Sequence, residues 1–162
     1  MIKLLITGGT LDKNYNPLTG ELEFSQSYLP DMLAQANCQT KITLQQLMLK
    51  DSLEITDQDR QIILQACLDS KQQQIIITHG TDTMEKTAMQ LYNHPQLKQK
   101  TIVLTGAMRP YMLGNSDALF NLGNAISAVK STQGGCYIAM NGELFNANKV
   151  QKNTKLGIFT TK

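Results

Sequence analysis

The chain has 162 residues, a length typical of one domain with its own hydrophobic core. Its 15 Lys and Arg residues are interspersed with 13 Asp and Glu residues, which gives a net charge of +2 at pH 7. This pattern excludes both the basic stripe of a nucleic-acid-binding protein and the like-charge blocks of a disordered tail.

The cysteines and the apolar runs indicate the compartment. Cys38, Cys67 and Cys136 lie far apart without CxxC spacing, and their odd number speaks against a disulfide framework. Free thiols are typical of reducing compartments. The apolar run at residues 4–6 is too short for a signal peptide, and no run approaches the ~18 residues of a transmembrane helix. We therefore expect a cytoplasmic protein that does not contact a membrane.

Predicted strands and helices alternate along the chain. An apolar run predicts a first strand at 3–6, and the turn residues that follow predict a loop or hairpin within 11–28. The later elements are a helix at 29–37, a strand at 41–48, a helix at 57–69 capped by Thr56, a strand at 74–78, a helix at 83–93, a strand at 101–105, a helix capped by Asn115 or Ser116, and a strand at 136–140. About five strands with crossover helices predict one α/β domain over 1–162. We expect a doubly wound, mostly parallel, flavodoxin-like sheet with helices on both faces.

Two segments place hydroxyl and carboxylate groups directly after predicted strands. Residues 6–10 read ITGGT, and residues 77–85 read ITHGTDTME. In doubly wound sheets, ligands bind outside the carboxyl ends of the strands, at the switch point in strand order. Two threonines, an aspartate and accessible backbone N–H groups would then share one pocket, which suits amide hydrolysis. His79 and His94 are the only histidines, so a Ser-His-Asp triad or a histidine-based metal site is poorly supported.

Each of these residues also has a purely structural interpretation. Asp82 lies three residues before Glu85, the spacing of an N-cap and its reciprocal partner. Gly8 and Gly9 could serve only to turn the chain after a strand. The remaining structural alternatives are turn residues for Thr10 and Thr81, a hydrogen-bonded and partly buried histidine for His79, and a solvated tail for Lys152.

Five motifs together resemble the bacterial-type L-asparaginase family. They are TGGT at 7–10, THGTDTME at 78–85, TGAMRP at 105–110, FNL at 120–122 and VQKNT at 150–154. The resemblance extends from residue 2 to about residue 155 and implies hydrolysis of L-asparagine to L-aspartate and ammonia. It also implies a small-molecule amino-acid substrate, no metal or other cofactor, and a homo-oligomer, either a dimer or a tetramer.

The resemblance assigns roles residue by residue. Thr10 corresponds to the nucleophile that forms an acyl-enzyme, and Tyr15 to the lid tyrosine that activates it. Thr81, Asp82 and Lys152 correspond to a cluster that orients water and assists proton transfer. The substrate-binding residues that it implies are Gly9, Ser52, Gly80, Thr81, Asp82 and Ala107. Ser52 would bind the α-carboxylate, Asp82 the α-ammonium, the Ala107 carbonyl the leaving amide, and the turns at Gly9 and Gly80 the oxyanion.

Two features of the sequence depart from the family pattern. The chain corresponds to the N-terminal domain of two-domain members, in which a partner subunit's C-terminal domain adds an acidic group; we therefore expect a more open site. Leu53 stands where a polar residue often follows the substrate-binding serine. The alternatives are a glutaminase or other small-amide hydrolase, a catalytically silent amino-acid-binding module and, more distantly, a nucleotide-binding flavodoxin-like protein. The last would need a phosphate-cradling motif, which the sequence lacks.

Overall fold

The computed structural model describes residues 1–162 and is built around one six-stranded sheet. The strands of this sheet are β1 (Ile2–Gly8), β4 (Ile42–Lys50), β5 (Gln74–Thr78), β6 (Thr101–Thr105), β7 (Gly135–Met140) and β8 (Glu143–Asn146). They lie in the order β4-β1-β5-β6-β7-β8. All neighbours pair in parallel except β7 and β8, which pair antiparallel.

Counted along the chain, the parallel strands have the spatial order 2-1-3-4-5, which is that of flavodoxin-like sheets. The predicted doubly wound, mostly parallel sheet is therefore confirmed. Strand β8 adds one strand to the five predicted. It returns along β7 after a turn at Asn141-Gly142, where both residues have positive φ. Asn-Gly is a strong hairpin signal, and the sequence prediction did not use it.

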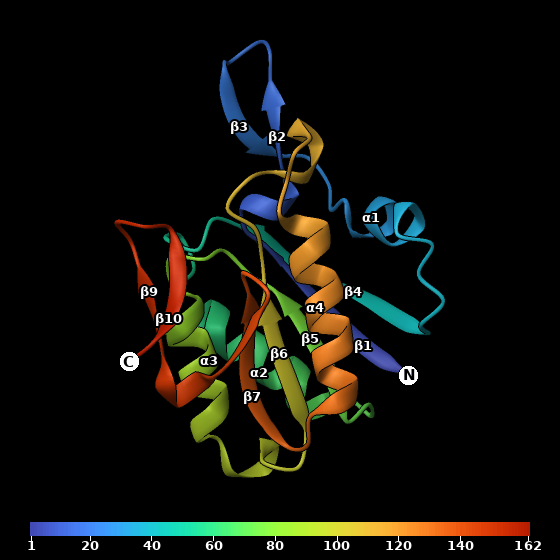
Figure 1. Ribbon diagram of the computed structural model, residues 1–162, viewed down its shortest axis with the longest axis vertical. Helices are drawn as coiled ribbons and strands as arrows, with labels where there is room; N and C mark the ends of the chain where they lie inside the picture. The colour runs from blue at the N-terminus through green and yellow to red at the C-terminus, as the bar shows by residue number, and fades with distance from the viewer.

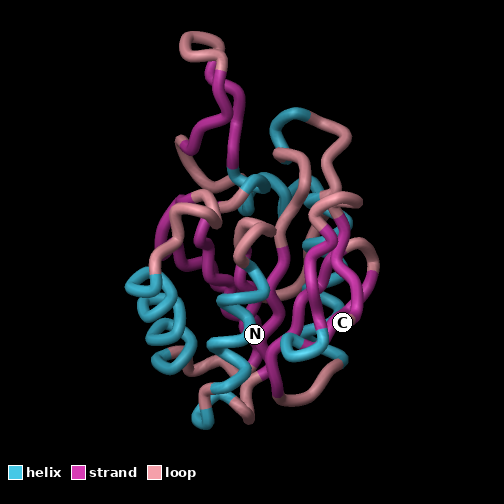
Figure 2. The backbone as a smooth tube through the Cα atoms, turned by 90° about the vertical axis from the view of Figure 1, so that its left-hand side faces the viewer, coloured by secondary structure: helices cyan, strands magenta, loops and turns pink.

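Four helices cover both faces of the sheet, as predicted (Figures 1 and 2). They are α1 (Leu29–Gln35), α2 (Asp57–Asp69), α3 (Met84–Asn93) and α4 (Ala118–Ser131). Alternating side chains of β1 divide the core: Leu5 packs with α2 and α3, whereas Leu4 and Ile6 pack with α1 and α4. None of the helices is long and apolar enough to cross a membrane.

The helix starts show where local sequence rules hold. Helix α2 begins with the predicted Thr56 cap: Asp59 N donates to Thr56 Oγ1 at 3.1 Å, and Thr56 N donates to Asp59 Oδ2 at 2.8 Å. The N-cap position of α4 is held by Asp117, without a side-chain cap hydrogen bond, so the prediction of Asn115 or Ser116 was wrong by one or two residues. The Ser116 hydroxyl still accepts a hydrogen bond from Ala118 N at 3.0 Å.

Two antiparallel hairpins flank the sheet. Strands β2 (Lys13–Asn16) and β3 (Glu21–Phe24) form a hairpin, one of the two alternatives predicted for residues 11–28, and it projects away from the rest of the molecule (Figures 1 and 2). Strands β9 (Val150–Asn153) and β10 (Ile158–Thr161) form a second hairpin beside α3, which the sequence prediction missed. Single 3₁₀ turns occur at Thr10–Asp12, Pro95–Leu97, Tyr111–Leu113 and Ala147–Lys149.

Candidate functional site

The switch point of the sheet lies between β1 and β5, because the chain leaves β1 toward β4 on one side and then returns to β5 on the other. Ile6 is paired in register with Thr78, so the two strands end at the same level. Thr7 Oγ1 donates to the Thr78 carbonyl oxygen at 2.7 Å and ties the two ends together. The turns that carry Thr10 and Thr81 therefore emerge side by side at the carboxyl edge of the sheet.

Glycines let the loops after β1, β5 and β4 approach one another at backbone distance. A Cβ atom on Gly9 would lie 2.4 Å from the Gly80 nitrogen, and a Cβ atom on Gly80 would lie 2.6 Å from the Ser52 Cβ. No other residue fits either contact without moving the backbone. These glycines bring the sequence-predicted residues Thr10, Thr81 and Ser52 to one place.

Lys152 of β9 completes a polar cluster with Thr81 and Asp82. Its Nζ donates to Thr81 Oγ1 at 2.7 Å and to Asp82 Oδ1 at 2.5 Å. Its side chain is 8% exposed, whereas that of Asp82 is 46% exposed, so Asp82 presents carboxylate surface to a ligand while Lys152 stays shielded. The interpretation of Lys152 as a solvated tail residue was therefore wrong.

The capping interpretation of Asp82 and Glu85 is also wrong. The N-cap position of helix α3 is held by Thr83, not Asp82, and no side chain makes a cap hydrogen bond there. Asp82 instead pairs with Lys152, and a Glu85 carboxylate oxygen accepts the backbone N–H of the same lysine. Both carboxylates are committed to β9, far away in the sequence, so a rule based on local spacing could not predict their partners.

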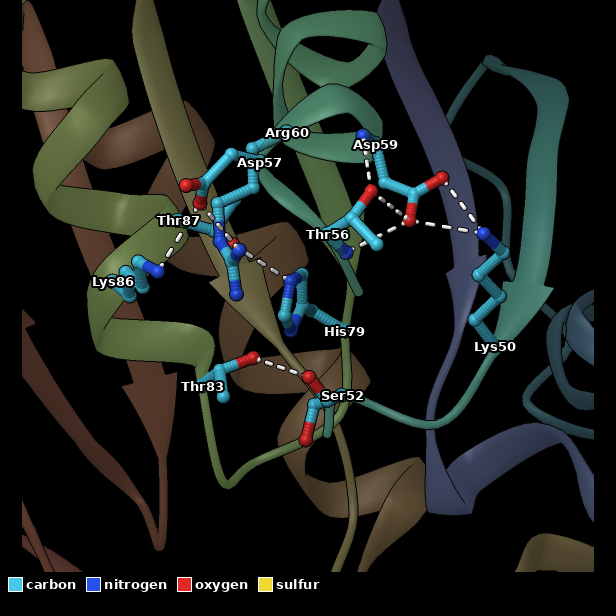
Figure 3. A network of polar contacts seen from close by, with 10 residues as sticks. All are labelled: Lys50, Ser52, Thr56, Asp57, Asp59, Arg60, His79, Thr83, Lys86 and Thr87. Atoms are coloured by element: carbon cyan, nitrogen blue, oxygen red, sulfur yellow. Dashed lines mark hydrogen bonds and ion pairs between the residues drawn. The ribbon is translucent and has the colours of Figure 1, made fainter. Parts of the chain in front are cut away.

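Ser52 joins the loop after β4 to the start of α3 (Figure 3). Its Oγ accepts the Asp82 N–H at 3.1 Å, and its carbonyl oxygen accepts the Thr83 hydroxyl at 2.7 Å. Because the hydroxyl is an acceptor in the first contact, its own proton is available to a ligand. The Ser52 hydroxyl thus lies at the backbone N–H of Asp82, whose carboxylate is exposed, while Ser52 itself is only 2% exposed.

Of the other predicted site residues, Thr10 and Ala107 lie in the loops after β1 and β6, whereas Tyr15 lies on the projecting hairpin. Thr10 follows the Gly9 turn and is half-buried, and its hydroxyl has no hydrogen-bond partner in the protein. Ala107 is fully buried after β6, and its neighbour Met108 accepts a weak contact from Thr81 Oγ1 at 3.6 Å. Tyr15 lies on β2, is 52% exposed and bonds to none of these residues, so the structure does not bring it to Thr10.

An open cavity of about 670 Å³ lies between the β2–β3 hairpin and the loop after β4. Its lining residues are Lys13, Leu22, Glu23, Phe24, Asp51, Leu53, Glu54 and Asp82. Lys13 Nζ pairs with Asp51 Oδ2 at 2.5 Å and links the hairpin to the loop that carries Ser52. Partial burial raises the pKa of Asp51, but the Lys13 hydrogen bond, the Leu53 N–H and the charges of Lys13 and Lys152 outweigh it, so the pKa is lowered.

Asp12 anchors the hairpin and was missed by the sequence analysis. Its Oδ1 accepts the Tyr28 N–H at 2.8 Å and the Ser27 hydroxyl at 3.0 Å, so it fastens the chain after β3 to the turn before β2. Its Oδ2 is buried without a partner. Burial raises the pKa of Asp12 to about 6, although the two hydrogen bonds lower it. One feature of the sequence indicates its importance, which is its position two residues after the candidate nucleophile Thr10.

This raised pKa makes stability depend on pH with a definite sign. The folded state holds the Asp12 proton up to about pH 6, whereas the unfolded chain loses it near 3.8. The free energy of unfolding should therefore fall as pH rises from about 4 to about 6, by up to about 3 kcal/mol from this group. Asp12→Asn keeps the Oδ1 acceptor and should remove that fall.

Urea unfolding at pH 4.5 and pH 7 measures this effect, with Asp31→Asn as the control because Asp31 is exposed on α1. If Asp12→Asn and the wild type lose the same free energy of unfolding between the two pH values, Asp12 does not titrate as the structure indicates.

No group of three His, Cys, Asp or Glu side chains is placed to hold a metal ion. The polar cluster at the switch point offers the Thr81 hydroxyl, the Lys152 amine and the Asp82 carboxylate, and the Thr10 hydroxyl lies on the neighbouring turn. A hydroxyl bonded to a shielded amine is an arrangement that can activate a nucleophile or a water molecule.

Comparisons with known proteins agree with this geometry. The family model described as "Asparaginase, N-terminal" matches residues 1–160. The chain is 30% identical to the glutaminase-asparaginase of Acinetobacter glutaminasificans, over 96% of this chain and 50% of that protein. Its fold matches the thermostable L-asparaginase of Thermococcus kodakarensis with a TM-score of 0.86, 29% identity and coverage of 99% of this chain and 50% of that one. It matches the probable cytoplasmic L-asparaginase of Campylobacter jejuni with a TM-score of 0.81, 26% identity and coverage of 99% and 51%. The chain thus spans about half the length of these relatives.

Proposed function

Because this chain belongs to the asparaginase family, as the match of the N-terminal family model over residues 1–160 shows, we propose that it hydrolyses the side-chain amide of L-asparagine to L-aspartate and ammonia. The observation that carries the proposal is the contact of Lys152 with Thr81 and Asp82 beside the Thr10 turn. Family membership supports the amidohydrolase class, and this cluster supports a reaction that needs no metal.

In the proposed reaction, Thr10 Oγ1 attacks the amide carbonyl carbon while its proton passes to the Thr81–Lys152 pair, and Lys152 passes one of its protons to the Asp82 carboxylate with which it is ion-paired. The tetrahedral intermediate collapses as the nitrogen takes up a proton and leaves as ammonia. Water then hydrolyses the ester between Thr10 and the aspartyl group. Threonine needs a neighbouring base for this attack, and the Asp82 carboxylate can take the proton through Lys152, whose Nζ lies 2.7 Å from the Thr81 hydroxyl and 2.5 Å from Asp82 Oδ1. Tyr15 could assist only after the hairpin moves toward Thr10.

The same site offers groups for the ends of an amino acid. The half-exposed Asp82 carboxylate suits the α-ammonium, and the Ser52 hydroxyl suits the α-carboxylate. The Ala107 carbonyl is proposed to receive the amide nitrogen. The Thr81 N–H makes no hydrogen bond within the protein, so it can donate to the developing oxyanion.

Ammonia release from L-asparagine, L-glutamine and D-asparagine by the purified protein tests the proposal. We expect L-asparagine to be turned over fastest, and added hydroxylamine to divert the acyl-enzyme to aspartyl hydroxamate. Acid quenching followed by peptide mapping should find the aspartyl group on Thr10. An aspartyl group on Thr81 would reassign the nucleophile, and no turnover of any amide would overturn the proposed activity.

Glutamine is the second candidate substrate, because the Acinetobacter relative is described as a glutaminase-asparaginase. The open cavity beside Asp82 supports it, since a longer side chain needs more room. If instead L-asparagine binds in a way that depends on Ser52 and Asp82 but releases no ammonia, the chain is an amino-acid-binding module.

We also propose a cytoplasmic location and a homo-oligomer. The three free cysteines and the description of the Campylobacter relative support the location. Leu22 and Leu53, at 41% and 74% exposed, line the open cavity and support its coverage by another copy of the chain. Sedimentation velocity at assay concentration should show a dimer or tetramer, and a monomer would contradict the oligomer.

A further inference from the structure

A histidine that the proposed mechanism does not use lies directly beneath the candidate site. His79 is fully buried between α2 and α3 (Figure 3). Its Nδ1 lies 2.8 Å from the carbonyl oxygen of the next residue, Gly80, and its Nε2 lies 2.8 Å from Thr87 Oγ1. Both ring nitrogens are therefore engaged, one by the turn of the site and one by helix α3.

These contacts fix which nitrogen carries the proton. A carbonyl oxygen can only accept a hydrogen bond, so Nδ1 must be the donor to Gly80. In the neutral ring, Nε2 is then an acceptor, and the Thr87 hydroxyl donates to it. The pKa of His79 is lowered to about 4, chiefly because burial disfavours the charged ring; the bond to Gly80 raises the pKa, and the positive charge of Arg60 lowers it.

The charged group that faces His79 comes from α2. Arg60 is 3% exposed, and its Nη1 donates to the surface residue Asp57 at 3.1 Å. The groups that approach His79 from α3 and from the Gly80 turn are the uncharged Thr87 hydroxyl and backbone carbonyl. The ring thus stays neutral, with its proton on Nδ1, throughout the neutral pH range.

The Gly80 carbonyl shares a peptide group with the Thr81 N–H. In a planar trans peptide these two bonds point in opposite directions. Because the imidazole holds the carbonyl on the buried side, the N–H must point away from the ring, toward the carboxyl edge of the sheet. That N–H has no partner within the protein.

We propose that His79 is a positioning residue that aims the Thr81 N–H at the substrate, with Thr87 holding the required tautomer. The inference rests on the proposed function, since the N–H is useful where an oxyanion develops. An N–H aimed at the oxyanion acts mainly in the transition state, so loss of its alignment lowers kcat more than it changes KM.

Two substitutions at His79 separate the two nitrogen contacts. In His79→Asn the short side-chain amide can still donate from near the Nδ1 position to Gly80, whereas in His79→Gln the longer amide reaches toward Thr87 instead. We expect His79→Gln to lower kcat about 10- to 100-fold with KM changed by less than about 3-fold, and His79→Asn to restore most of that loss. Equal losses in the two variants, or a loss that appears only in KM, would overturn the proposal.

A second measurement does not depend on turnover. The ¹⁵N NMR shifts of the wild-type ring should show a protonated Nδ1 and an unprotonated Nε2 from pH 5.5 to pH 8, and Thr87→Val should weaken this preference. An Nε2-protonated ring, or titration near 6.5, would overturn the positioning role even in an active enzyme. If the wild type releases no ammonia from any amide, the proposed function fails. Two NMR observations then still decide whether His79 orients the turn: the tautomer of the wild-type ring, and the chemical shift of the Thr81 amide in the two His79 variants.

Discussion

Thr10→Val and Lys152→Met are each expected to lower kcat for L-asparagine hydrolysis by about 10² or more, and the double variant is expected to be little worse than either. Valine keeps the shape of threonine without the nucleophilic hydroxyl. Methionine keeps the stem of Lys152 but removes the amine that bonds Thr81 Oγ1 at 2.7 Å and Asp82 Oδ1 at 2.5 Å. If the two groups serve one step, removing the second after the first costs little.

Steady-state ammonia assays on the four proteins measure this, and Lys149→Met is the matched control. Lys149 precedes β9, is exposed and forms no ion pair, so its loss should leave kcat within about 2-fold of the wild type. Multiplicative losses in the double variant would mean that the two residues act in separate steps. Full activity of Lys152→Met would remove the amine from the mechanism.

Gly9→Ala is expected to abolish amide hydrolysis and to lower the free energy of unfolding by about 4 kcal/mol or more. Gly9 has φ 83° and ψ 175°, a region that residues with a side chain rarely adopt. The added Cβ would also lie 2.4 Å from Gly80 N, about 1 Å inside normal contact. The loops that carry Thr10 and Thr81 must then separate, and a misplacement of about 1 Å can cost about 10² in rate.

Gly114→Ala separates backbone strain from this close approach. Gly114 has a similar conformation, φ 68° and ψ 167°, but no atom lies within 4 Å of the position of its Cβ. We expect Gly114→Ala to lower the free energy of unfolding only by the cost of backbone strain, about 1–3 kcal/mol, and to leave the activity unchanged. Urea unfolding and ammonia assays on both variants give the comparison. Equal stability losses would show that the contact between Gly9 and Gly80 is not tight.

The fold could be predicted wherever a single segment carried its own signal. The apolar runs at Gln74–Thr78 and Thr101–Thr105 have the predicted bounds, because they are buried on both faces and end at turn residues. The α2 cap at Thr56 lies within one turn of the helix and was also predicted. Strands β9 and β10 were missed because β9 is largely polar and pairs only with β10.

The site was predictable as a set of residues but not as a set of contacts. Family resemblance named Thr10, Thr81, Asp82 and Lys152, and the structure brings the last three into hydrogen-bonding contact. Local spacing gave Asp82 the wrong partner, since Lys152 lies 70 positions further along the chain. The anchoring role of Asp12 depends on Ser27 and Tyr28, which no local pattern connects to it.

The β9–β10 hairpin, which supplies Lys152, has a consequence for how the protein is made. Thr81 and Asp82 are synthesised before β6, whereas their partner Lys152 is synthesised after every strand of the central sheet. Contacts between such distant positions form late, because the loop between them must close first. A nascent chain can therefore assemble its sheet and core while the amine of the cluster is still absent. The proposed activity then arises only when the β9–β10 hairpin docks against α3. A ribosome-bound chain that still lacks this hairpin would be folded in large part but would not catalyse the reaction.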